Sequence, residues 1–206
     1  MRPSRRTVPF VAVLLGLCGC GGNDAAIPPR QFATGPALAP ARFACPAPGT
    51  AVALSNGGRI SYTQAEGPTC VSATRGGPYR ILYHVWSDDG AGGGRNAAEA
   101  LGHLWPLEVG KRVRFAVPQP DGPSEAGWEE SFEVAGTRTV TTAAGRFDTY
   151  VILHTEHGAG RAPATRVLYY APAEHLIVRK EIGGRDGDSA ETRFTPWEVT
   201  EITRAL

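Results

Sequence analysis

The stretch from Val134 to Glu181 constrains the fold of this chain more than any other. It contains apolar, β-branched and aromatic runs that are separated by Gly, Pro and Ala breaks. Such runs are typical of strands, and their short separations favour antiparallel neighbours. The stretch therefore predicts consecutive antiparallel strands at the centre of a sheet. It names neither a substrate nor a reaction.

The rest of the chain favours the same fold class. With 206 residues, the chain is long enough for one domain with a sizeable core. Its 26 Gly and 17 Pro residues predict many turns and therefore many short strands. The regular spacing of these turn signals predicts an all-β fold. We expect a single curved antiparallel sheet, as a half-barrel or open barrel, with one short helix.

The expected elements follow from the alternation of apolar and polar residues between turn signals. A hairpin is expected at Asn56-Gly57-Gly58, because Asn-Gly is a strong hairpin signal. A short helix is expected at Asn96–Leu104. The expected strands are Ala51–Leu54, Arg59–Gln64, Thr69–Thr74, Tyr79–Trp86, Arg112–Val117, Trp128–Val134, Thr137–Thr142, Arg146–His157, Thr165–Ala171, Leu176–Ile182 and Glu191–Thr200.

The N-terminus has the pattern of a signal peptide, which we assign to residues 1–19. Three arginines precede an apolar run, Val8–Leu17, and small residues follow it. This run is too short to cross a bilayer, which takes about 20 residues in a helix. Removing the leader leaves 18 Lys and Arg against 20 Asp and Glu, a net charge of −2. Such a balance gives no electrostatic reason to expect a nucleic-acid partner.

The end of this leader, Leu17-Cys18-Gly19-Cys20, resembles the lipobox of bacterial lipoproteins. The resemblance implies cleavage before Cys20 and its lipidation, so that acyl chains anchor the protein to a membrane. Gly21 and not Asp follows Cys20, which by the usual sorting rule implies the outer membrane, with the domain facing the periplasm. The alternative is an ordinary secretory signal with a chance cysteine.

A tether is expected at residues 20–44, and the all-β periplasmic domain at residues 45–206. The tether region is rich in Pro, Ala and Gly and shows no strand alternation, which is typical of an extended or disordered linker. At ~3.1 Å per residue in an extended polyproline-like form, it could reach roughly 75 Å. Its expected role is to hold the domain away from the membrane.

A disulfide between Cys45 and Cys70 is expected, because no other thiol remains once Cys18 is removed and Cys20 is lipidated. An even pair in an oxidising compartment is typical of a structural bridge. In the chain-entropy model it would stabilise the fold by about 3–4 kcal/mol. The alternative, a redox-active pair, is disfavoured because the chain has no C-x-x-C motif.

Four sequence motifs resemble those of a family of uncharacterised bacterial envelope proteins, many of them lipoproteins. The motifs are Pro106-Leu107 with Gly110-Lys111, Val134 with Gly136 and Val140, Ala144-Gly145 with Phe147, and Tyr169-Tyr170-Ala171-Pro172. They cover about half of the mature chain. This chain differs from the family pattern at two positions: Arg146, where Thr is common in the family, and His175, where Gly is usual. The resemblance implies a curved antiparallel sheet and no particular activity.

His154 and Glu156 are the candidates for a metal-dependent hydrolase, since alternate residues of a strand share a face. A third ligand would come from elsewhere, such as His175 or Asp148. The alternative is a polar face at the end of a strand, which we favour. No G-x-S-x-G motif is present. The Gly-rich segment Ser87–Leu104 is not a P-loop, because it lacks the required spacing.

The Asp186-Gly187-Asp188 segment is expected to be a hairpin turn and not a calcium loop, because its spacing does not follow the calcium-loop motif. We expect no catalytic residues, no metal and no cofactor.

The aromatic residues Tyr83, Trp86, Tyr169 and Tyr170 are the candidates for ligand binding. On a curved sheet, such residues could hold a lipophilic molecule, although they more often form the core. The leading hypothesis is a lipid-anchored, non-catalytic binding or interaction module for a lipophilic ligand or an envelope protein. The alternatives are a metal-dependent hydrolase and a purely structural envelope factor.

Overall fold

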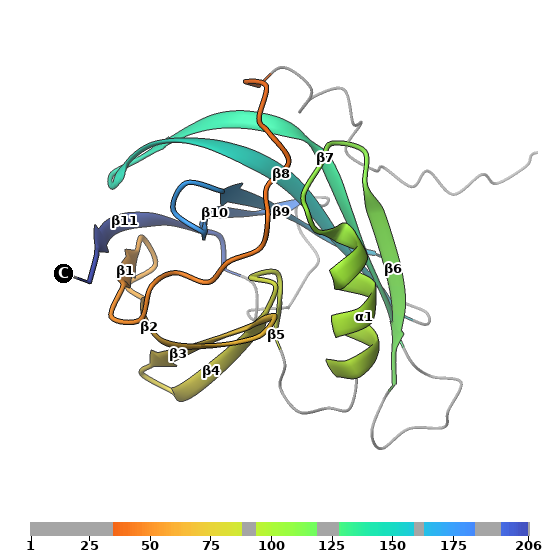
Figure 1. Ribbon diagram of the computed structural model, residues 1–206, viewed down its shortest axis with the longest axis horizontal. Helices are drawn as coiled ribbons and strands as arrows, with labels where there is room; N and C mark the ends of the chain where they lie inside the picture. Colours follow the sequence, from red (N-terminus) through yellow and green to blue (C-terminus); the bar gives the residue numbers. More distant parts are fainter. Residues whose placement is uncertain (1–34, 88–93, 119–127, 159–162, 184–194, 206) are drawn as a thin grey trace, which may run out of the picture.

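The computed structural model describes residues 35–87, 94–118, 128–158, 163–183 and 195–205 (Figure 1). Within these ranges the chain forms one 11-stranded sheet and one α-helix. The elements are β1 (Ala51–Leu54), β2 (Arg59–Glu66), β3 (Thr69–Thr74), β4 (Gly77–Leu82), β5 (Trp86–Ser87), α1 (Gly94–Leu104), β6 (Arg112–Val117), β7 (Trp128–Thr142), β8 (Gly145–His157), β9 (Ala164–Ala171), β10 (Leu176–Gly183) and β11 (Trp197–Thr203).

The strands are ordered β5-β4-β3-β2-β1-β11-β10-β9-β8-β7-β6, and neighbouring strands pair antiparallel. The C-terminal strand β11 lies between β1 and β10 and so joins two series of hairpin-connected strands. The strands at the two ends, β5 and β6, do not pair with each other, and α1 packs against β6 (Figure 1). The sheet is therefore curved but not closed, which confirms the predicted fold class with its single helix.

Most predicted elements are confirmed within a few residues, and three strands have the predicted bounds: β1, β3 and β6. The hairpin between β1 and β2 turns where the Asn-Gly signal places it. Leu54 N–H donates to the Gly58 carbonyl at 2.9 Å, and Gly57 has a left-handed φ of 80°. The helix begins at Gly94, two residues before the predicted start.

The predicted strand Tyr79–Trp86 is wrong beyond Leu82. Tyr83 and His84 both have left-handed backbone angles, with φ of 50° and 63°, so the chain turns there and resumes pairing only at Trp86. Non-glycine residues seldom adopt this conformation, and the alternation of residues 79–86 does not indicate a turn. The alternation of faces that the sequence predicted through Trp86 is lost at this turn.

The predicted break between Val134 and Thr137 is also wrong, because β7 runs through it. Val134 pairs with Ile152 and Gly136 with Val151, so that Ala135 is the extra residue of a β-bulge. A bulge bends and twists a strand without ending it, and β7 and β8 curve strongly in Figure 1. The last strand starts at Trp197 and extends to Thr203, whereas the prediction was Glu191–Thr200; residues 191–194 lie outside the described residues.

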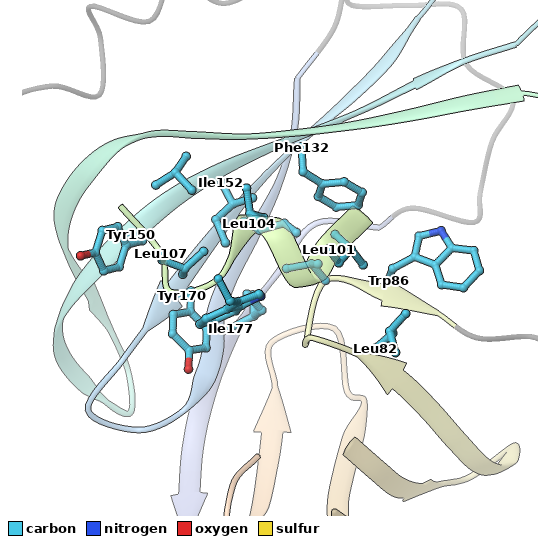
Figure 2. Close-up of a cluster of buried hydrophobic side chains, with 14 of the residues drawn as sticks. Leu82, Trp86, Leu101, Leu104, Leu107, Phe132, Tyr150, Ile152, Tyr170 and Ile177 are labelled. Carbon is cyan, nitrogen blue, oxygen red and sulfur yellow. The ribbon is translucent and has the colours of Figure 1, made fainter. Parts of the chain in front are cut away.

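Hydrophobic side chains cover both faces of the central strands. Adjacent residues of β8 and β9 point to opposite faces, so Ile152 and Tyr170 belong to one cluster and Val151 and Tyr169 to the other. The first cluster lies on the face that carries α1, which we call the inner face (Figure 2). It includes Leu82, Trp86, Leu101, Leu104, Leu107, Phe132, Ile152, Tyr170 and Ile177.

Residues 35–44 cross the inner face in an extended conformation, and we call them the strap. Ala41 forms a β-bridge with Leu107 through two backbone hydrogen bonds, of 3.1 and 2.8 Å. The Tyr150 hydroxyl donates to the Ala39 carbonyl at 2.8 Å. Gly35 lies so close to β7 that a Cβ there would collide with the Thr137 carbonyl. The backbone of the strap is therefore bonded directly to the folded domain.

The strap corrects the predicted C-terminal end of the tether. Its proline and alanine content predicted a linker, but Leu38 and Phe43 pack against the core and Ala41 is buried. Residues 35–44 are thus part of the domain. The rest of the predicted tether and the predicted signal peptide at residues 1–19 lie outside the described residues.

Candidate functional site

Four ionisable side chains from three adjacent strands meet on the inner face, and we call them the charged cluster. They are Glu130 of β7, His154 and Glu156 of β8, and Arg166 of β9. Glu130 and His154 are almost completely buried, at 2% and 3% exposure. His154 Nε2 contacts Glu130 Oε2, and Arg166 bonds to both His154 Nδ1 and Glu156 Oε1.

The strand register brings the charged cluster together. Glu130 lies opposite Glu156 in the β7–β8 ladder, and Arg166 lies opposite His154 in the β8–β9 ladder. Directly paired residues point to the same face of a sheet. The Phe132 ring stacks on the His154 imidazole, with ring centroids 4.1 Å apart, and so fixes its orientation.

The hydrogen bonds define the protonation of the cluster. A guanidinium can only donate, so His154 Nδ1 accepts from Arg166, and a neutral imidazole carries its proton on Nε2, facing Glu130. Burial alone would raise the pKa of Glu130. The bonds from His154 and from Trp128 Nε1, the latter at 2.8 Å, and the charge of Arg166 outweigh that effect and hold this pKa below its usual value.

The third residue beside His154 and Glu156 is Glu130, and the predicted choices, His175 and Asp148, are wrong. The ligand atoms of Glu130, His154 and Glu156 all lie within 4.8 Å of one another. Asp148 instead accepts a hydrogen bond from Thr139 at 2.6 Å on the same hairpin. His175 lies in the turn after β9, with its Nδ1 3.5 Å from the Tyr170 hydroxyl.

The donor set of the charged cluster fits an internal ion-pair network better than a resident divalent cation. Arg166 donates to the Nδ1 lone pair that a metal would need, and Nε2 faces Glu130 with its proton. A cation among these groups would also lie close to the guanidinium charge, and like charges repel strongly in a buried environment. Arg166 therefore occupies the position where a cation would balance the two carboxylates.

The four aromatic candidates do not line one cavity in the described structure. Tyr83, Trp86 and Tyr170 belong to or pack on the inner-face cluster, while Tyr169 points to the other face. Trp86 is 8% exposed and Tyr170 is fully buried, so both are core residues. The Tyr169 hydroxyl donates to Glu181 at 2.9 Å.

Two of these candidates, Tyr83 and Tyr170, lie beside two further aromatic residues, Phe43 and Trp105. Phe43 of the strap packs against Tyr83 and Trp105, with ring centroids 4.9 and 5.4 Å away. Trp105 in turn packs edge-on against Tyr170 at 5.0 Å. The position of Phe43, two residues before Cys45, could have indicated that it packs on the sheet. A disulfide from Cys45 to Cys70 in β3 holds the preceding residues close to the sheet.

The predicted disulfide between Cys45 and Cys70 is confirmed, and it joins the end of the strap to β3. The imidazole of His84 lies beside it, with Nε2 3.5 Å from Cys70 Sγ. The same nitrogen is 2.8 Å from the Ala44 carbonyl, to which it donates. Burial lowers the pKa of His84 to about 4, and the nearby His175 acts in the same direction, so the ring is neutral at ordinary pH.

An open, shallow hollow of about 400 Å³ lies between α1 and β6. It is lined by Asn96, Glu99, Ala100, His103, Arg112, Val113 and Arg114. The two arginines are paired across the β6–β7 ladder, Arg112 with Glu133 at 2.7 Å and Arg114 with Glu129 at 3.2 Å. None of the aromatic candidates lines it.

Several predicted features lie outside the described residues: Cys20 with the lipobox, the Gly-rich loop between β5 and α1, and Asp186-Gly187-Asp188. Among the described helices, none is long and apolar enough to cross a membrane.

No protein-family profile matches the chain, and no curated protein does. Three solved structures are similar to the fold at a low level. The hypothetical lipoprotein YmcC from Escherichia coli is 10% identical, with 82% of this chain and 90% of that chain covered and a TM-score of 0.44. A proposed exported protein with a YmcC-like fold from Bacteroides fragilis is 15% identical, with 80% of this chain and 100% of that chain covered and a TM-score of 0.38. A proposed lipoprotein from Parabacteroides distasonis is 10% identical, with 81% of this chain and 100% of that chain covered and a TM-score of 0.39.

Proposed function

We propose that the chain is a lipid-anchored protein of the bacterial envelope whose β domain is a non-catalytic interaction module. The anchor is Cys20, and the proposal for it rests on the apolar run followed by Leu17-Cys18-Gly19-Cys20. Gly21 after that cysteine supports placement in the outer membrane, with the domain facing the periplasm. The partner is another protein of the same compartment.

The observation that carries the interaction hypothesis is the filling of the inner face by the chain itself. Leu101 and Leu104 of α1 are fully buried there (Figure 2). The strap adds Leu38 and Phe43, which pack against the same cluster. The ionisable side chains of the charged cluster contact one another on this face. An enclosed ligand would have to displace these side chains, whereas a partner protein can bind at the surface without any rearrangement.

The hollow between α1 and β6 is the surface that we assign to the partner. It combines charges of both signs with Val113 and Ala100, a mixture typical of interfaces that form between folded proteins. The strand β6 ends the sheet, and α1 is the element that flanks it. A partner seated in the hollow would contact both elements at once.

Photo-cross-linking in cells tests this assignment. A photoreactive residue replaces Ala100, which lines the hollow, or Ala73, an exposed alanine on β3 that serves as the matched control. We expect a discrete protein adduct from position 100 and none from position 73. Equal adducts at both positions, or none at position 100, would contradict the proposal.

Native mass spectrometry of the detergent-extracted protein separates this function from lipid carriage. The interaction module should show the mass of the anchored chain alone after mild activation. A retained lipophilic molecule that is lost in the Phe43→Ala variant would favour a carrier instead, since Phe43 covers the inner aromatic residues.

A metal-dependent hydrolase remains the second candidate, because Glu130, His154 and Glu156 do converge. Elemental analysis of the purified protein tests it. One equivalent of a divalent metal in the wild type, absent from Glu130→Gln, would favour the hydrolase. Equal metal content in the two proteins would leave the interaction module as the better account.

A further inference from the structure

A second group of possible metal ligands lies where the strap meets the sheet. Cys45 directly follows the strap, Cys70 belongs to β3 and His84 lies in the turn between β4 and β5. The two sulfur atoms and one ring nitrogen all lie within 4.8 Å of one another. Cys70 is fully buried and His84 is 7% exposed. Three separate segments of the chain thus contribute one donor each.

The three donors are of the types that bind a soft cation. Zinc is bound by thiolates at about 2.3 Å and by imidazole at about 2.0–2.1 Å in tetrahedral sites. Ligand atoms around such an ion are separated by about 3.3–3.8 Å in that geometry. His84 Nε2 and Cys70 Sγ, 3.5 Å apart, already have such a separation. The two sulfur atoms are bonded to each other in the disulfide and would have to move apart after reduction. Two thiolates would neutralise a divalent cation, which lowers the cost of burying it.

The backbone at His84 favours a role for its imidazole beyond packing. Tyr83 and His84 are consecutive non-glycine residues in the left-handed region, a conformation that persists only where neighbouring structure holds it. This turn directs Nε2 toward Cys70 Sγ at 3.5 Å. An apolar side chain could fill the same space without these features.

We infer that Cys45, Cys70 and His84 form a redox-controlled site for one soft metal cation such as Zn²⁺. While the disulfide is intact, its sulfur atoms are bonded to each other and are not thiolate ligands. A dithiol reductant can reduce it by exchange: the reductant becomes a disulfide, and Cys45 and Cys70 become thiols. The cation then displaces both thiol protons.

Binding at His84 also requires its Nε2 proton to move to Nδ1, so the hydrogen bond to the Ala44 carbonyl is lost. Both the disulfide and the bound cation would connect the strap to β3. The reduced, metal-free protein would have neither the disulfide nor the metal connection. The site would therefore make attachment of the end of the strap depend on redox state and on metal supply.

Cobalt titration of the full chain tests the site. Cys18→Ser and Cys20→Ser leave Cys45 and Cys70 as the two remaining cysteines. After reduction with a phosphine and its removal under argon, Co²⁺ is added as a spectroscopic substitute for zinc. We expect one equivalent to bind with a thiolate-to-cobalt charge-transfer band and tetrahedral ligand-field bands. The oxidised protein should show neither. Cobalt at Glu130, His154 and Glu156 would give no thiolate band.

Two variants show whether His84 is a ligand. His84→Asn keeps both cysteines and suits the left-handed backbone, because Asn tolerates that region; we expect binding weakened by roughly tenfold or more. His157→Asn at the end of β8 is the matched control and should bind as the parent does. Equal affinity in His84→Asn would overturn the inference, as would the absence of a thiolate band in the reduced parent. Loss of the β-sheet circular dichroism signal on reduction would overturn it too, because the site requires the fold.

Discussion

The two series of strands that meet at β11 are stabilised in different ways. The β6–β10 series has strands buried on both faces, as shown by the fully buried side chains of Val151 and Ile152, adjacent residues of β8. In the β1–β5 series, β2 and β4 are largely exposed, and Tyr62 is the buried side chain of β2. This series is instead linked by the Cys45–Cys70 disulfide. The comparison teaches that one part of the sheet depends on burial and the other on cross-links.

The largest expected effect comes from removing a core side chain of the β6–β10 series. Tyr170→Ala should lower the free energy of unfolding by about 3–5 kcal/mol, because the ring is fully buried and packs against Trp105 and His84. Urea denaturation measures the loss. Tyr79→Ala in β4 is the matched control, since Tyr79 is 40% exposed, and should change stability by about 0.5 kcal/mol. Similar losses in both variants would remove the distinction between the two series.

Removing the cross-link should affect the β1–β5 series selectively. The double variant Cys45→Ala and Cys70→Ala opens a loop with a sequence separation of 25 and should cost about 3.5 kcal/mol in the chain-entropy model. Hydrogen exchange should show lost protection in β2, β3 and β4 and unchanged protection in β8 and β9. Equal loss of protection in both series would mean that the sheet opens as one unit.

The pH dependence of stability sharpens the same comparison through His84. Its pKa is lower in the folded protein than its ordinary value of 6.5, so unfolding takes up a proton. The contribution of His84 is full above pH 6.5 and is lost as the pH falls toward about 4. At about 1.4 kcal/mol per unit, the total is about 3 kcal/mol.

Denaturation of wild type and His84→Asn across this range measures that contribution. The variant should show a flatter profile between pH 6.5 and 4, and parallel profiles would refute the assignment. Glu130 acts at lower pH, because its pKa is held below the usual carboxyl value. Its contribution is present above that usual value and is lost only as the pH falls through the lowered pKa.

The smallest effect is expected from the exposed ion pair between Arg80 of β4 and Glu66 of β2. Their side chains are 44% and 38% exposed, and exposed pairs contribute little. Arg80→Gln should lower the free energy of unfolding by about 0.5 kcal/mol or less, as measured by urea denaturation. A loss above about 1 kcal/mol would show that this exposed pair also contributes substantially to the stability of the β1–β5 series.

Local patterns predicted the strands well because each depends on a few neighbouring residues. The Asn56-Gly57 hairpin and the alternation in Arg112–Val117 needed no knowledge of distant contacts. The left-handed turn at Tyr83 and His84 could not be predicted in this way, since non-glycine residues seldom adopt that conformation and the residues around them alternate as in a strand. The bulge at Ala135 resembles a strand end in sequence, because Gly136 is as typical of a break as of a bulge.

The charged cluster shows why a site is harder to predict than a strand. His154 and Glu156 were found because they lie two residues apart on one strand. Glu130 and Arg166 lie on other strands, and only the register places them beside His154. A single sequence does not specify that register. The strap was missed for a related reason: its contacts are all with residues distant in sequence, such as Leu107 and Tyr150.

The attachment of the strap also limits how far an anchored domain can travel. The proposed lipid site, Cys20, lies 15 positions before Gly35, which lies against Thr137 of β7. At ~3.3 Å per residue, this connection spans at most about 50 Å in any conformation. A domain anchored through so short a linker would stay within about 50 Å of the bilayer surface. A partner in the same membrane would then be present at an effective concentration on the order of millimolar. Weak contacts at the hollow would then suffice for substantial occupancy.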